Sequence, residues 1–82
     1  MKPLTRRQRE VLRMVASGYT SAQAGNRLGV ARATIDRHLA DVYRQLGAND
    51  RSHAVALAIY YGHITLPELA AIAGVHTQEQ AA

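Results

Sequence analysis

The feature that most constrains the fold is a pair of short helical segments joined by a glycine turn, within residues 20–46. The first segment begins at Thr20 and reaches the turn at Gly29, and the second begins at Ala31 or Arg32. Apolar residues recur in the second segment at helical spacing, which predicts one buried stripe. This stripe consists of Ile35, Leu39, Val42 and Leu46. Because short helices are marginal alone, the two segments must pack on each other and on neighbouring helices.

Capping signals predict a further helix before this pair. Thr5 has Gln8 as its capping-box partner, and the same box recurs at Thr20 and Gln23. Gly18 supplies a left-handed stop for the first helix. The predicted inner positions of the first two helices are Val11, Leu12, Val15 and Ala16, then Ala24 and Leu28.

A fourth helix is predicted after the pair. Gly47 ends the third helix, Asp50 caps the fourth, and the fourth runs from Arg51 to about Tyr61. Its main apolar stripe is expected to comprise Ala54, Leu57, Ala58 and Tyr61, with Val55 and Ile59 beside it. The fold class is therefore all-α.

The outward face of the third helix carries the functional prediction. A turn-linked helix pair is the geometry that places one helix in the major groove of DNA. Arg grips guanine through two hydrogen bonds, and Asp accepts one from cytosine. The candidate base-reading residues are Arg32, Ala33, Asp36, Arg37 and Ala40. For Asp36 the alternative is an intrahelical ion pair with Arg32, four residues before it.

Other residues are candidates for phosphate contacts. The N-terminus of the second helix, at Thr20 and Ser21, offers N–H groups, hydroxyls and the positive end of the helix dipole. Thr34 adds a hydroxyl, and Arg44 lies two turns beyond Arg37. Ordinary capping by Thr20 is the alternative, and the two roles use different atoms.

Charge is unevenly distributed along the chain. All ten Lys and Arg residues lie within residues 1–51, against four acids there, which gives that part a net charge of +6. Residues 52–82 carry two acids and no Lys or Arg. A solvated basic surface would explain some of this, but the confinement of the cations to the turn-bearing part favours a polyanion partner such as double-stranded DNA.

Several function classes are disfavoured. The chain has no Cys, and the spacing of its four His residues fits no standard zinc site, so we expect no metal and no cofactor. No set of nucleophile, base and orienting group indicates an enzyme. The longest stretch without Asp, Glu, Lys or Arg, residues 52–67, is too short to span a bilayer, and the N-terminus lacks an apolar signal region. We therefore expect a cytoplasmic protein.

Residues 4–62 resemble the LuxR/GerE-type helix-turn-helix domain of bacterial regulators. The resemblance implies a four-helix domain whose third helix enters the major groove and whose fourth helix often mediates dimerisation. It also implies that His38 packs against the second helix. The matching residues are Leu4, Thr5, Arg7, Val11, Leu12, Ala16, Gly18, Leu28, Thr34, Ile35, His38, Leu39, Val42, Leu46, Gly47, Arg51, Ala54 and Gly62.

The chain departs from the family pattern at four places. Gln8 replaces an acidic residue, so a neutral hydrogen bond is expected instead of a buried ion pair. The segment 23–25 gives the second helix a smaller and looser inner face. Ala31 replaces the Ser that caps the recognition helix, at a cost of about 1 kcal/mol. Asp36 replaces a Lys, so Arg37 is expected to supply the cationic contact.

We expect residues 1–64 to form the DNA-binding domain and residues 65–82 a short fifth helix followed by a disordered tail. Thr65 and Glu68 form a third capping box. The fifth helix is expected either to cover the core or to join a dimer interface. Apolar residues surround most of the fourth helix, which predicts a homodimer through Val55, Ile59 and Tyr60.

Two functions follow from the sequence. The first is a stand-alone, sequence-specific DNA-binding transcription regulator that acts as a dimer. The second is a protein-interaction module that pairs with another regulator, or with RNA polymerase, and has reduced DNA contacts. Asp36 and the Ala-rich outward face favour the second function, whereas Arg32, Arg37 and Arg44 favour the first.

Overall fold

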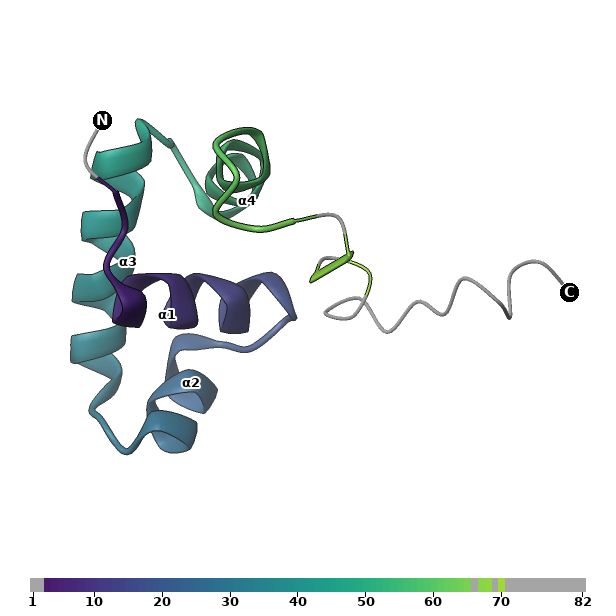
Figure 1. The fold of residues 1–82 in the computed structure, drawn as a ribbon. Helices are drawn as coiled ribbons and strands as arrows, with labels where there is room; N and C mark the ends of the chain where they lie inside the picture. The colour runs from purple at the N-terminus through teal and green to yellow at the C-terminus, as the bar shows by residue number, and fades with distance from the viewer. Residues whose placement is uncertain (1–2, 66, 69, 71–82) are drawn as a thin grey trace, which may run out of the picture.

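A computed structural model describes residues 3–65, 67–68 and 70 of the chain. Within them lie four α-helices: α1 (Arg6–Ala16), α2 (Ser21–Leu28), α3 (Arg32–Leu46) and α4 (Arg51–Tyr60). Figure 1 shows α3 upright at one side, with α1 running across from it, α2 below α1 and α4 above. The predicted all-α fold with four helices is confirmed.

The helices begin where their capping residues predict. The Gln8 backbone N–H donates to Thr5 Oγ1 at 3.1 Å, and the Thr5 N–H donates to Gln8 Oε1 at 2.9 Å. Thr20 and Gln23 form the same reciprocal pair, at 3.1 and 2.9 Å. Asp50 Oδ1 accepts from the backbone N–H of His53 at 2.8 Å. Each cap satisfies donors that the first helical turn leaves without partners.

The core contains the stripe predicted for α3. Its four members are buried, and the described buried apolar residues are Leu4, Val11, Leu12, Val15, Ala24, Ile35, Leu39, Val42, Leu46, Ala54, Ala58 and Ile64. Leu4 and Ile64, which flank the helices, were not predicted to belong to this core. Within the described chain, no helix combines the length and apolar character that crossing a bilayer requires.

The predicted inner face of α4 is partly wrong. Ala54 and Ala58 are fully buried, and Leu57 is partly buried. Tyr61 keeps right-handed helical backbone angles at the C-cap, and its N–H donates to the Leu57 carbonyl at 2.9 Å, yet the residue is 46% exposed. Gly62, with φ of 82°, follows in the left-handed conformation and ends the helical path. Tyr61 is therefore the last residue on that path, and no further turn of α4 covers its ring.

The inner face of α2 is small, as predicted, but it is close-packed rather than loose. Ala24 and Gly25 are buried. A Cβ atom at Gly25 would lie 2.7 Å from the carbonyl oxygen of Val30, in the turn that leads into α3. The Val30 N–H also donates to the Gly25 carbonyl at 2.9 Å. Glycine at this position lets the turn approach the helix backbone directly.

Gln8 is 8% exposed and makes a neutral polar contact, as the sequence predicts. Besides the N-cap bond, its Oε1 atom lies 3.5 Å from Nε2 of Gln45, at the long limit of a hydrogen bond. This contact joins the N-terminal end of α1 to the C-terminal part of α3 without a buried charge.

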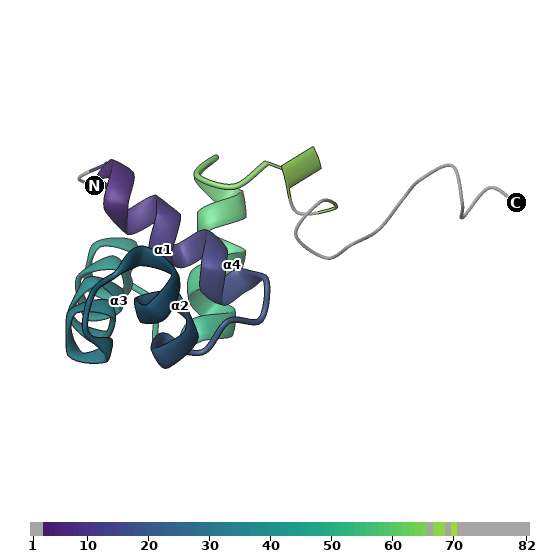
Figure 2. The same ribbon diagram turned by 90° about the horizontal axis from the view of Figure 1, so that it is seen from below.

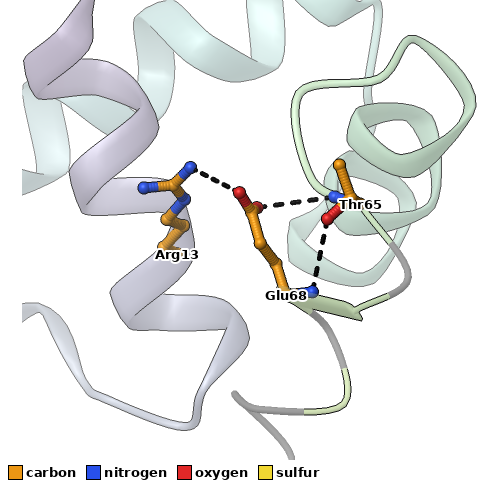
Figure 3. A network of polar contacts seen from close by, with 3 residues as sticks. All are labelled: Arg13, Thr65 and Glu68. Atoms are coloured by element: carbon orange, nitrogen blue, oxygen red, sulfur yellow. Dashed lines mark hydrogen bonds and ion pairs between the residues drawn. The ribbon is translucent and has the colours of Figure 1, made fainter.

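The capping box at Thr65 is present (Figure 3). The Glu68 N–H donates to Thr65 Oγ1 at 3.3 Å, and the Thr65 N–H donates to Glu68 Oε2 at 3.4 Å. The predicted fifth helix and tail depend on residues 66, 69 and 71–82, which lie outside the described residues.

Restoring a cap to α3 should stabilise the fold. The N-cap residue Ala31 has extended φ and ψ angles of −69° and 151° and makes no side-chain cap bond. In Ala31→Ser, the new hydroxyl should accept from the N–H of Thr34 and raise the free energy of unfolding by about 1 kcal/mol. Urea denaturation measures the change.

The matched control for this variant is Ala33→Ser. Ala33 is exposed inside the first turn of α3, beyond the N-cap position. Serine there should lower the free energy of unfolding by about 0.5 kcal/mol through helix propensity. Equal effects of the two substitutions would contradict the capping explanation.

Candidate nucleic-acid interface

The outward face of α3 presents the five residues predicted to read bases. All five are exposed; Ala33, Arg37 and Ala40 lie opposite the buried stripe, and Arg32 and Asp36 lie beside it. Figure 2 shows α3 at the edge of the helical bundle, with its outer side clear of the other helices. The structure thus brings these residues together on one surface that a groove of DNA can approach.

The shape of this surface suits a close approach. Ala33 and Ala40 lie two turns apart and project only a methyl group each. Arg37 lies between them along the helix, and no ion pair among the described residues involves it. Its guanidinium group therefore projects from the helix between two small side chains.

Asp36 has the alternative contact that its spacing suggested. Its Oδ2 atom lies 3.7 Å from Nε of Arg32, one helical turn away. The two side chains are 53% and 73% exposed, so the pair contributes little to stability. Such a pair can exchange its partners for a base edge at small cost.

Arg44 is paired with Asp41, a contact that the sequence reasoning missed. Nη2 of Arg44 donates to Asp41 Oδ1 at 2.6 Å. The two residues are three apart on α3, a spacing that would have indicated the pair. Two of the three outward cations of α3 therefore have an acidic neighbour on the same helix.

At the N-terminus of α2, Thr20 is exposed and Ser21 is partly buried. The side-chain oxygen of Thr20 accepts from the Gln23 N–H, which leaves the Thr20 hydroxyl proton and the N–H groups of Ser21 and Ala22 as donors. Thr34 is partly buried in the first turn of α3. The three hydroxyl-bearing residues thus lie at or within the first turns of α2 and α3.

Tyr19 and Arg27 form a second contact that was not predicted. Nη1 of Arg27 donates to the Tyr19 hydroxyl at 3.0 Å, and the guanidinium carbon lies 5.9 Å from the ring centroid. The contact links the last turn of α2 to the loop before its N-terminus. The two residues are eight positions apart and are separated by a helix start, so no local sequence pattern indicates the contact.

The residues predicted to form a dimer lie along α4. Val55 and Ile59 are partly buried, whereas Tyr60 is 80% exposed. The rings of Tyr60 and Tyr61 meet edge to face, with centroids 5.0 Å apart. Tyr61 thus adds to an exposed aromatic pair at the C-terminal end of α4.

The histidines do not gather into a site in the described chain. No group of three His, Cys, Asp or Glu residues there is arranged to hold a metal ion. His53 Nδ1 accepts from the Asn49 N–H at 3.0 Å, which is a structural contact in the turn before α4. His76 lies outside the described residues.

Comparison with known proteins gives this geometry a context. Residues 2–58 match the family described as bacterial regulatory proteins, luxR family. The match covers all of α1, α2 and α3 and most of α4. No solved structure matches the chain significantly.

Two curated relatives illustrate the similarity. The chain is 41% identical over 59 residues to "Probable transcriptional regulatory protein SgaR" of Hyphomicrobium methylovorum. The aligned region is 72% of this chain and 28% of that protein. It is 43% identical over 56 residues to "HTH-type transcriptional regulator MalT" of Yersinia pestis (strain Pestoides F). The aligned region is 68% of this chain and 6% of that protein. The chain thus spans less than a third of the length of each of these relatives.

Proposed function

The chain belongs to the luxR family of bacterial regulatory proteins, a family of DNA-binding transcription regulators and not of enzymes, and we propose that it reads DNA with α3 in the major groove. The observation that carries the proposal is the outward face of α3. Three arginines and two alanines lie there, opposite or beside a buried apolar stripe. Such a face combines attraction to phosphate with room for a close approach to bases.

Arg37 is the principal base reader in this proposal. Its guanidinium group projects between the small residues Ala33 and Ala40, and a bidentate contact with guanine contributes about 1–3 kcal/mol of discrimination. Arg32 and Asp36 form the second reading element. Their exposed pair contributes less than about 1 kcal/mol, so base contacts can replace it.

The phosphate contacts flank these readers. Thr20 and Ser21 at the N-terminus of α2, and Thr34 in the first turn of α3, supply hydroxyl and N–H donors. Arg44 supplies a cation near the C-terminal end of α3. In the free protein that side chain pairs with Asp41 at 2.6 Å, so a phosphate must replace this exposed partner.

We also propose that two copies bind one site through α4. The exposed end of this helix carries Tyr60 and Tyr61, with Ile59 and Val55 partly buried beside it. A two-fold dimer places two recognition helices about one DNA turn apart. The target is then a near-palindrome with half-sites separated by about 10 base pairs between centres.

An alternative function is supported by the acidic residues of α3. Asp36 pairs with Arg32 and Asp41 pairs with Arg44, which reduces the positive potential of the outward face. A module with these pairs would act by docking to another regulator or to RNA polymerase. Selection from random-sequence duplexes separates the two functions, because only the first enriches a defined site.

Binding to DNA should weaken steeply with salt. Each neutralised phosphate contributes about −0.9 to the slope of log affinity against log salt concentration. Several arginine and hydroxyl contacts per copy therefore predict a slope of several units, measured by fluorescence anisotropy with a selected duplex. A flat response, or no enriched sequence at low salt, would exclude the DNA-binding function.

Arg37 and Arg44 form a matched pair of variants. Arg37→Ala should cost about 1–3 kcal/mol and relax the preference at one base pair, because it removes a base contact. Arg44→Ala should weaken all sequences alike and reduce the salt slope by about one unit. Repeating the selection with each variant distinguishes the two roles. An unchanged preference for Arg37→Ala would show that the reading face is wrongly assigned.

The dimer should depend on the exposed end of α4. Tyr60→Glu introduces a charge at a position that is 80% exposed, so the fold should be retained while cooperative binding to the full palindrome is lost. Val55→Glu and Ile59→Glu should have the same effect, and circular dichroism checks that they remain helical. A duplex with one half-site is the control, because its affinity should not change.

Sedimentation with and without DNA tests the same dimer independently. The wild-type protein should bind the full palindrome as two copies. A single copy on the full site, together with wild-type binding by all three variants, would refute the dimer.

A further inference from the structure

Three arginines form a row along the outer face of α1. Arg6, Arg9 and Arg13 follow at helical steps of three and four residues, and all three are exposed. They lie opposite the helix face that buries Gln8 and Val11. At about 1.5 Å per residue, the row extends roughly 10 Å along the helix. We call it the α1 arginine row.

One end of this row already holds a carboxylate (Figure 3). Nη2 of Arg13 donates to Oε1 of Glu68 at 2.9 Å, across 55 positions of sequence. The other carboxylate oxygen of Glu68 accepts from the N–H of Thr65. Glu68 lies beyond residues 2–58, which the family model matches. At the Arg13 end, the row therefore binds a carboxylate that a capped turn presents to it.

The rest of the row lacks such a partner in the described chain. No ion pair there involves Arg6 or Arg9, whereas Arg7 pairs with Glu10 at 3.7 Å. Burial lowers the pKa of His63, and the charge of Arg9 lowers it further. The charge of Arg9 thus reaches His63, which lies in the segment after α4 that also contributes Glu68.

The row is separate from the reading face of α3. Packing between α1 and α3 is part of the core, where Val11 and Ile35 are fully buried. The arginine row and the reading face lie on the outer sides of these two helices. The two surfaces therefore belong to different helices, and substitutions can be made in one without changing the other.

We propose that the α1 arginine row docks an acidic helical segment of a partner protein, with Glu68 occupying one of its three positions in the free molecule. Carboxylates at positions i, i+3 or i+4, and i+7 of a partner helix repeat the spacing of the row. Arginine forks bind carboxylates bidentately, and the group that Arg13 holds in the free molecule is a carboxylate, which favours an acidic protein segment as the partner. The inference goes beyond DNA binding and does not depend on it.

A synthetic peptide tests the proposal on the full chain. The probe is a fluorescein-labelled Ala- and Gln-based helix with glutamates at positions i, i+3 and i+7, measured by anisotropy at low salt. The double variant Arg6→Ala/Arg9→Ala should weaken its binding about fivefold, since two exposed ion pairs are lost. The control Arg27→Ala/Arg51→Ala removes the same charge elsewhere and should have less than about a twofold effect.

Glu68 provides a second, opposite readout. Glu68→Gln keeps an acceptor for the Thr65 N–H but removes the charge that competes for Arg13, so peptide affinity should rise about twofold. A permuted peptide with the same composition should bind more weakly to every variant. Because Glu68→Gln also raises the net charge of the protein by one, the gain should be larger for the patterned peptide than for the permuted peptide, which has the same charge; equal gains would indicate net charge alone.

Two results would overturn the proposal. One is equal weakening by the two double variants, which would indicate net charge alone. The other is a loss of DNA affinity in Arg6→Ala/Arg9→Ala similar to that in Arg44→Ala, which would make the row a DNA contact. Failure of the wild-type protein to bind DNA would leave the peptide measurements unaffected, so the two proposals fail separately.

Discussion

The structure depends on burying the apolar stripe of α3. Ile35 and Val42 are fully buried and Leu39 and Leu46 nearly so, which fixes the rotation of the helix about its own axis. Because an α-helix has 3.6 residues per turn, this rotation also decides which residues face outward. Arg37, two positions after Ile35, cannot turn inward without bringing a buried residue into water. The packing of the core thereby sets the composition of the proposed DNA-reading surface.

Local features were predictable from the sequence, and features that depend on the chain path were not. Thr5, Thr20 and Asp50 cap helices through residues three positions away, so their patterns are visible in the sequence. Tyr61 was placed wrongly because the helical path stops at Gly62, so no further turn of α4 covers its ring. The close approach of Val30 to Gly25 and the contact of Arg13 with Glu68 depend on how helices pack, which no local pattern records. The outward residues of α3 were predictable because one helical period governs both faces.

Exposed ion pairs are a common element of the proposed binding surfaces. Asp36, Asp41 and Glu68 each hold an arginine at a position where both partners remain at least about one-third exposed. Pairs of this kind contribute about 0–1 kcal/mol each. They therefore add little to the free energy of unfolding, but they restrict the positions of long side chains. A phosphate, a base edge or a partner carboxylate can replace the internal partner at small cost.

This arrangement distinguishes Arg37 from the other arginines of α3. In the proposed complex, Arg32 and Arg44 would exchange an acidic neighbour for DNA, and each exchange would reduce the net gain from the new contact. Arg37 has no such neighbour among the described residues, so its contact with a base is opposed only by desolvation and lost side-chain freedom. Arg32 and Arg44 then contribute less to affinity than their charge suggests. In the proposed complex, discrimination between sequences would be concentrated at the position between Ala33 and Ala40, where small side chains let the helix approach the bases most closely.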